Sequence, residues 1–184
     1  GICLVYTNAT PLGGYRKAYT AIATGKLFGQ IPYMFIIAFV IGLVMWFVFN
    51  YTRHGKYMYA IGGNEAAAEV SGVNVKKTKI IIYVTAAALY AIAGFLLGAK
   101  AGGASVNMGQ GYELEAIAAC TIGGVSVNGG IGRISGVVIG VLVFELLKSS
   151  MQFLGIQTNY QYIVQGIVII VAIALDIRKY IAKK

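Results

Sequence analysis

Charge is what this sequence has least of. Of its 184 residues only 11% are charged, whereas 58% are hydrophobic and the mean hydropathy is +0.75. A soluble domain carries roughly 25% charged residues because its surface must face water. The deficit disfavours a disordered chain, a disulfide-stapled secreted domain and a cytosolic globular enzyme. Since the apolar residues also gather in long runs, the sequence predicts an integral membrane protein with several spans.

Cysteine and histidine are scarce as well, with two cysteines and one histidine in the whole chain. Cys3 and Cys120 lie far apart, so neither a disulfide framework nor a metal-ligand spacing is present. We expect both to be small buried hydrophobic residues. The segment GGVSVNGGIGR lacks the Lys-Ser/Thr ending of a phosphate-binding loop. No nucleophile, paired carboxylates or Cys/His cluster stands out, so the sequence predicts no catalytic residues, no metal and no enzymatic activity.

Acids are fewer than bases, with 6 Asp and Glu against 15 Lys and Arg, for a net charge of +9. In a soluble protein this excess would suggest nucleic acid as a partner. Here nine of the bases flank apolar runs, as cytoplasmic loops of membrane proteins do. They are Arg53, Lys56, Lys76, Lys77, Lys79, Arg178, Lys179, Lys183 and Lys184. We therefore expect both basic segments to be cytoplasmic and the partner to be the lipid membrane, with no nucleic acid.

The apolar runs predict an all-α, polytopic transmembrane bundle with about five complete spans. These runs cover residues 32–50, 80–99, 113–127, 134–151 and 160–175. The first has 19 residues without a charge, or roughly 28 Å of helix for a hydrocarbon core of about 30 Å. The run 113–127 is short, and we expect it to be thin, tilted or broken at Gly123-Gly124. Three crossings after residue 100 then bring the basic tail back inside.

The polar segments complete this map. Residues 1–184 form a single transmembrane domain, and residues 7–30 are expected to be an external aqueous loop. Residues 1–6 resemble the end of a span that begins upstream, so we expect the chain to lack an N-terminal part. Residues 52–79 are the predicted cytoplasmic loop.

This cytoplasmic loop contains the signals of a short helix. Asn64 can cap its start, Glu65 favours the positive end of its dipole, and Gly72 supplies the left-handed residue that commonly ends a helix. We expect a helix from about Glu65 to Ser71. Because two turns are marginal in water, the helix must pack on its own domain or on a partner. The residues alone leave both a connecting loop and a docking element open.

Three long segments together are similar to one family of membrane proteins. These are RHGKYMYAIGGNEAAAEVSGVNV, GYELEAIAACTIGGVSVNGGIGRISGVVIGV and YQYIVQGIVIIVAIALDIRKY. They resemble the permease subunits of the ribose/galactose (methyl-galactoside) branch of ABC sugar importers. The resemblance covers nearly all of residues 33–184.

The resemblance implies a function and a set of partners. The chain would translocate galactose, methyl-galactoside or a ribose-type monosaccharide across the bacterial cytoplasmic (inner) membrane. A periplasmic or cell-surface binding protein would deliver the sugar, and a second permease copy would form a homodimer. The permease would hold no cofactor, because the cytosolic ABC ATPase subunit binds the ATP. The short helix would dock on that ATPase through Gly63, Asn64, Glu65, Ala67, Ala68 and Gly72.

The acids near the short run suggest a translocation path and an alternative function. Glu113, Glu115, Gly123 and Gly124 are the candidate path residues, although both acids can also be solvated at a helix end. We expect Glu145 and Lys148 to neutralise each other. A secondary transporter driven by ions or protons could use Glu113, Glu115 or Glu145 for coupling. Nothing specific supports a channel or scaffold.

Overall fold

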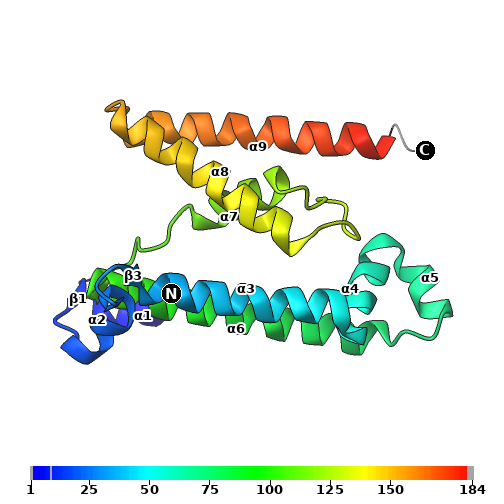
Figure 1. Ribbon diagram of the computed structural model, residues 1–184, viewed down its shortest axis with the longest axis horizontal. Coiled ribbons are helices and arrows are strands. Elements are labelled where there is room, and N and C mark those ends of the chain that lie inside the picture. The colour runs from blue at the N-terminus through cyan, green and yellow to red at the C-terminus, as the bar shows by residue number, and fades with distance from the viewer. Residues whose placement is uncertain (1, 9, 182–184) are drawn as a thin grey trace. The chain divides into compact units, whose positions relative to one another are not determined.

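The computed structural model describes residues 2–8 and 10–181, and the chain falls into two compact units (Figure 1). Unit 1 lies within residues 1–45 and 79–110, and unit 2 within residues 46–78 and 111–184. Two long helices, α3 (Tyr33–Tyr51) and α6 (Val75–Ala101), each contribute to both units.

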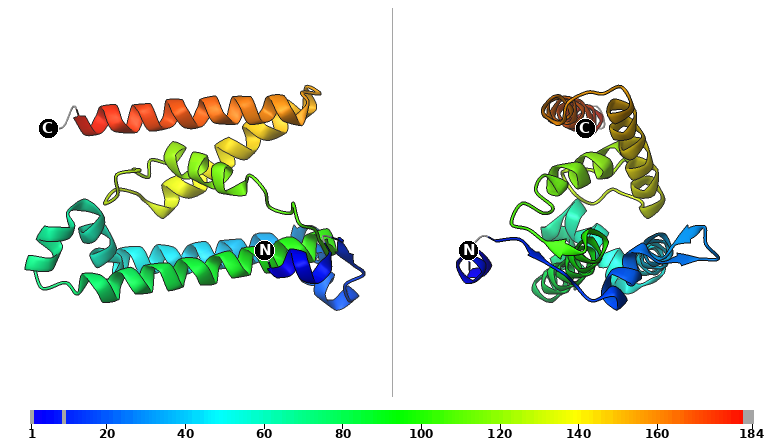
Figure 2. Two further views of the ribbon diagram at one scale, coloured as in Figure 1. Left: turned by 180° about the vertical axis from the view of Figure 1, so that it is seen from behind. Right: turned by 90° about the vertical axis from the view of Figure 1, so that its left-hand side faces the viewer.

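Unit 1 contains most of α3 and α6, which run in opposite directions (Figures 1 and 2). Its other elements are α1 (Ile2–Thr7), α2 (Lys17–Thr24) and the antiparallel strand pairs β1 (Leu12–Gly13) with β4 (Gly103–Ala104) and β2 (Lys26–Leu27) with β3 (Ile31–Pro32). Residues 7–30, predicted as an aqueous loop, therefore contain a helix and short strands. The membrane side of this segment stays a prediction.

Tyr19 attaches α2 to α6. Its hydroxyl donates a hydrogen bond of 2.7 Å to the carbonyl of Phe95, and the two rings meet edge to face at 4.8 Å. A Cβ added at Gly98 would lie 2.9 Å from the same hydroxyl. The absence of a side chain at Gly98 thus lets the tyrosine reach the backbone of α6, which is a helix attachment that apolar periodicity does not reveal.

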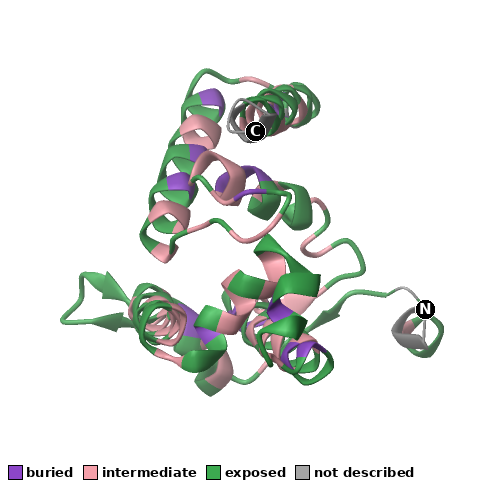
Figure 3. Ribbon diagram, turned by 90° about the vertical axis from the view of Figure 1, so that its right-hand side faces the viewer, coloured by how far each residue is buried: buried purple, intermediate pink, exposed green. Residues whose placement is uncertain are grey.

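Four helices in the described part of the chain are long and apolar enough to cross a membrane. They are α3, α6, α8 (Ile134–Phe153) and residues 159–178 of α9 (Thr158–Ile181). Few residues of these helices are buried (Figure 3), and in α3 none is, where the apolar side chains of Phe35 and Phe39 are 64% and 59% exposed. Such surfaces would be unfavourable in water and suit lipid. The chain is a multi-pass membrane protein.

Within the residues that the structure describes, four helices are long enough for complete spans, rather than the predicted number of about five. The run 113–127 forms α7 (Tyr112–Ile122), a helix of only 11 residues that ends at Gly123. At 1.5 Å per residue it extends about 16 Å, roughly half of the hydrocarbon thickness. The predicted break at Gly123-Gly124 is confirmed, and Gly124 has a φ of +83°. Because an irregular backbone is tolerated at membrane depth only where protein covers it, α7 needs close neighbours.

Those neighbours are α8 and α9, the other long elements of unit 2. The core of this unit consists of Ala118, Ala119 and Phe144, with Ile122 and Ile169 packed against them. Two small residues one turn apart at the end of α7, Ala119 and Gly123, lie against two glycines one turn apart on α8, Gly136 and Gly140. Cβ atoms added at the two α8 glycines would collide with the carbonyl oxygens of Gly123 and Ala119. The helices therefore touch backbone to backbone, as small residues allow in membranes.

Contacts within unit 2 place three segments at one end of it. Asp176, near the end of α9, accepts a hydrogen bond of 2.9 Å from the Ser126 hydroxyl, which lies just beyond α7. A Cβ added at Gly62 would lie 2.5 Å from the backbone nitrogen of Gly130. The α7 helix and the loop after it thus bring the chain to the end of unit 2 that holds residues 52–78. Three membrane passages after residue 100, one of them half helix, stay a prediction.

This arrangement predicts the membrane sides of three exposed positions. In a variant without native cysteines, we expect Lys56→Cys and Asn128→Cys to react with a membrane-impermeant thiol reagent from the cytoplasmic side only. Gln157→Cys should react from the opposite side, because the 20 residues of α8 separate it from Asn128. The measurement is labelling of intact cells against inverted membrane vesicles. Labelling of position 128 from the side of position 157 would contradict the arrangement.

Candidate functional site

The helix predicted in residues 52–79 is present as α5 (Glu65–Val70). The Asn64 side chain caps it, since its Oδ1 atom accepts a hydrogen bond of 3.0 Å from the Ala67 backbone nitrogen. At the other end, Gly72 has a φ of +83°, and its N–H bonds to the carbonyl of Glu69 at 2.9 Å. The Val73 N–H bonds to the carbonyl of Ala68 at 3.1 Å, which completes a Schellman motif. Both predicted ends are confirmed.

The side chains of α5 divide into one buried residue and an exposed remainder. Ala68 is 4% exposed and contributes the packing of α5 on its own domain, whereas Val70 is 90% exposed. Ala67 and Glu69 are exposed as well. An apolar side chain and alanines on a short helix at the end of a membrane domain form a small, smooth surface. Such a surface can enter a groove on a partner with little side-chain entropy lost.

A second helix, α4 (Arg53–Gly63), supports α5 and was not predicted. The Thr52 hydroxyl caps it by accepting from the Gly55 backbone nitrogen at 3.2 Å, and also donates to the carbonyl of Val48 at 2.6 Å. A Cβ added at Gly55 would lie 2.6 Å from the Cα atom of Phe49. Thr52 and Gly55 thus fold α4 tightly back on the end of α3. The sequence does contain a signal for α4, because Thr52 is a residue type that often caps a helix. The bases and glycines that follow it favoured the interpretation as a loop.

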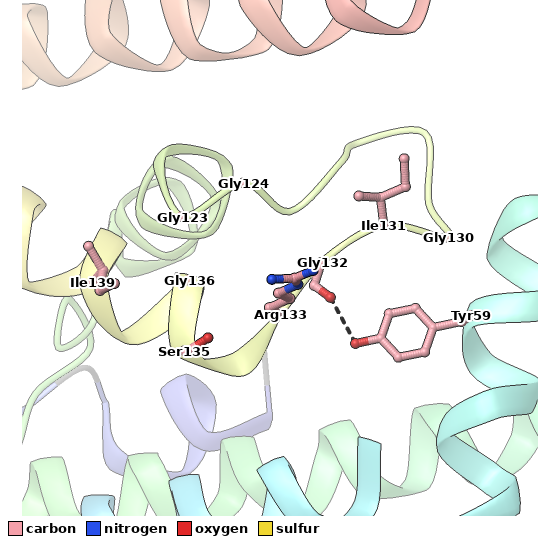
Figure 4. Close-up of a pocket in the computed structure, with 10 residues that line it drawn as sticks. All are labelled: Tyr59, Gly123, Gly124, Gly130, Ile131, Gly132, Arg133, Ser135, Gly136 and Ile139. Carbon is pink, nitrogen blue, oxygen red and sulfur yellow. Dashed lines mark hydrogen bonds between the residues drawn. The ribbon is translucent and has the colours of Figure 1, made fainter. Parts of the chain in front are cut away.

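A cavity of about 470 Å³ lies between α4 and the α7–α8 connection. Figure 4 shows its lining residues, which are Tyr59, Gly123, Gly124, Gly130, Ile131, Gly132, Arg133, Ser135, Gly136 and Ile139. The Tyr59 hydroxyl donates a hydrogen bond of 2.8 Å to the Gly132 carbonyl across one side of it. Of the candidate path residues, Gly123 and Gly124 line this cavity, whereas Glu113 and Glu115 do not.

The two candidate acids of α7 have different surroundings. Glu113 is exposed in the first turn of the helix, where the dipole favours a negative charge. Glu115 forms an ion pair of 2.7 Å with Lys148 on α8, and the exposed fractions of the two side chains are only 17% and 23%. The direct partner of Lys148 is therefore Glu115 on another helix, and the predicted neighbour Glu145 acts on the lysine only through its charge. The assignment of both acids to a translocation path stays a prediction.

Comparisons with known proteins define the class of this multi-pass protein. The family profile described as "Branched-chain amino acid transport system / permease component" matches residues 2–173. The chain therefore belongs to this family of membrane permease components. No solved structure matches it.

Named relatives are similar along nearly the whole chain. The galactose/methyl galactoside import permease protein MglC of Haemophilus influenzae is 40% identical over 96% of this chain and 54% of its own length. The ribose import permease protein RbsC of Escherichia coli is 39% identical over 97% of this chain and 57% of its own length. The corresponding protein of Bacillus subtilis is 41% identical over 97% and 56%. The chain spans about half the length of these relatives.

The Glu115–Lys148 pair predicts a coupled effect on stability. Glu115→Gln or Lys148→Met leaves one charge largely buried between helices, and should cost about 2 kcal/mol, or roughly 5 °C in the unfolding temperature in detergent. Removing both charges should recover part of the loss. Glu113→Gln, which changes an exposed acid two residues away, is the matched control and should cost no more than the helix-dipole contribution of about 0.5 kcal/mol, or roughly 1 °C. If the loss in the double variant equalled the sum of the losses in the two single variants, the pairing would be contradicted.

Proposed function

We propose that this chain is part of the membrane subunit of an ATP-driven sugar importer in the bacterial cytoplasmic membrane. The sugar would be galactose, methyl-galactoside or a ribose-type monosaccharide, and the chain itself would perform transport without enzymatic chemistry. Support comes from the relatives, which are named import permeases for these sugars. A binding protein that delivers the sugar and a second permease copy are further parts of the proposal.

The observation that carries the proposal is α5. A six-residue helix is too short to persist in water alone, yet this one is capped at both ends and keeps Val70 90% exposed. A loop that merely connected two spans would need neither the caps nor the exposed apolar residue. We assign α5 and its flanking residues Gly63, Asn64 and Gly72 as the docking element for a cytosolic ATPase that binds the ATP.

The docking assignment predicts the effect of a large charge on α5. Ala67→Arg places a guanidinium on the exposed face, where a close-fitting groove would have to desolvate it. We expect co-purification of the ATPase with the tagged permease to weaken about tenfold or more, which corresponds to about 1.4 kcal/mol. Membrane insertion should be unaffected.

Ala60→Arg is the matched control, because Ala60 is exposed on α4, outside the docking element. This variant should retain the ATPase. Unchanged ATPase retention and unchanged sugar uptake in Ala67→Arg would rule out α5 as the docking element.

The energy source separates the importer from the alternative, an ion- or proton-coupled carrier. The part-buried Glu115–Lys148 pair at the short helix α7 is the feature that favours a carrier. We expect uptake of radiolabelled galactose or ribose by vesicles to require ATP and the binding protein, and to persist when an uncoupler abolishes the proton gradient. Uptake that the uncoupler stops while ATP remains would support the carrier instead.

A further inference from the structure

A chain of direct contacts connects the docking helix to the membrane helices of unit 2. It begins at α4, against which α5 packs, and continues into the loop of residues 126–132, which joins α7 to α8. Two contacts join α4 to this loop. The Tyr59 hydroxyl donates to the Gly132 carbonyl at 2.8 Å, and the backbone of Gly62 lies directly against that of Gly130.

The loop is tied together internally. The Ser126 backbone nitrogen donates to the carbonyl of Ile131 at 2.9 Å, and the Gly129 nitrogen donates to the carbonyl of Ser126 at 3.2 Å. The Ser126 hydroxyl also accepts from the Asn128 nitrogen at 3.3 Å. Gly129 and Gly130 have φ values of +90° and +72°, which favour glycine. These bonds make the loop one body that can be displaced as a whole.

Asp176 attaches the loop of residues 126–132 to α9. A single atom, Oδ2, accepts both the Ser126 hydroxyl at 2.9 Å and the Val127 backbone nitrogen at 3.1 Å. Ser126 is 7% exposed, so water competes little for this contact. The loop is therefore attached to α4 on one side and to α9 on the other, while its own ends continue into the tightly packed α7 and α8.

We propose that residues 126–132 transmit the movement of α4 and α5 to α7, α8 and α9, and that Gly62 and Asp176 are positioning residues for this transmission. The inference rests on the proposed function, because it takes α5 as the element that the ATPase moves. Gly62 lets two backbones touch, so no flexible side chain absorbs the displacement. Asp176 prevents the loop from moving without α9.

The glycine at position 62 is itself informative. Within a helix, glycine costs about 1 kcal/mol relative to alanine. Gly62→Ala should thus favour the α4 helix locally while forcing its backbone away from Gly130. A purely structural role of the contact would then show as poorer accumulation or poorer ATPase retention, whereas a role in transmission would lower the uptake per ATP in a complex that still assembles.

The test uses the complex purified from native membranes through a tag on this chain and reconstituted in proteoliposomes, with ATP and the sugar-binding protein supplied. It measures the uptake of radiolabelled galactose or ribose per ATP hydrolysed, together with ATPase retention. We expect Gly62→Ala and Asp176→Ala to retain the ATPase and to hydrolyse ATP, with uptake per ATP reduced at least about fivefold. Asp176→Asn should restore the ratio, because one amide oxygen can accept both hydrogen bonds.

Gly166→Ala is the matched control: Gly166 is a glycine within α9 whose added Cβ would meet nothing within 4 Å. Its ratio should stay within about twofold of that of the parent protein. If Gly62→Ala fails to accumulate, Tyr59→Phe replaces it, since this change removes only the hydrogen bond to Gly132. The transmission role would be overturned if Asp176→Ala, and separately Gly62→Ala or Tyr59→Phe, each showed the same uptake per ATP as the parent protein. Failure of Asp176→Asn to restore the ratio would overturn the hydrogen-bond role of Asp176.

These outcomes are distinct from a failure of the proposed function. If the parent complex showed no ATP-dependent uptake, the importer assignment would fall, and the transmission role with it. If the parent complex coupled normally and every variant did too, only the transmission role would fall.

Discussion

The backbone contact between α7 and α8 is the constraint on which the rest of unit 2 depends. An 11-residue helix cannot cross a membrane, and the irregular segment after it exposes backbone groups that lipid cannot satisfy. Gly136 and Gly140 solve this problem by letting α8 lie directly on Ala119 and Gly123. The same closeness brings the connecting loop to the end of α9, where Asp176 satisfies both a hydroxyl and a backbone nitrogen.

A common principle operates at the α4 contact. Gly62 and Gly130 meet without side chains between them, as the glycines of α7 and α8 do. Contacts of this kind have little freedom to rearrange, because no rotamer change can relieve a displacement. The family relationship makes the chain a membrane permease component, and the proposed transport cycle requires rigid connections of this sort between an ATPase-driven helix and the spans.

Much of the candidate site was predictable because its signals are local. The Asn64 cap and the left-handed Gly72 are one-residue effects, and the structure has α5 beginning and ending where they predict. The family itself followed from long motifs around this helix. By contrast, Tyr59 and Asp176 were missed as contact residues, since each bonds to a residue at least 50 positions away. The direct ion-pair partner of Lys148 was missed for the same reason: Glu145 is an i, i+3 neighbour in the sequence, whereas Glu115 lies 33 positions away.

The sequence by itself determined the membrane class, the four long helices and the ends of α5, because hydropathy over some 20 residues and helix capping act within a short stretch of chain. It also indicated a break at Gly123-Gly124. Only the tertiary structure decided that the apolar run 113–127 contains a half-length helix and which charges meet. Those features depend on which backbones come close enough to touch, and that closeness arises from packing between segments distant in the chain.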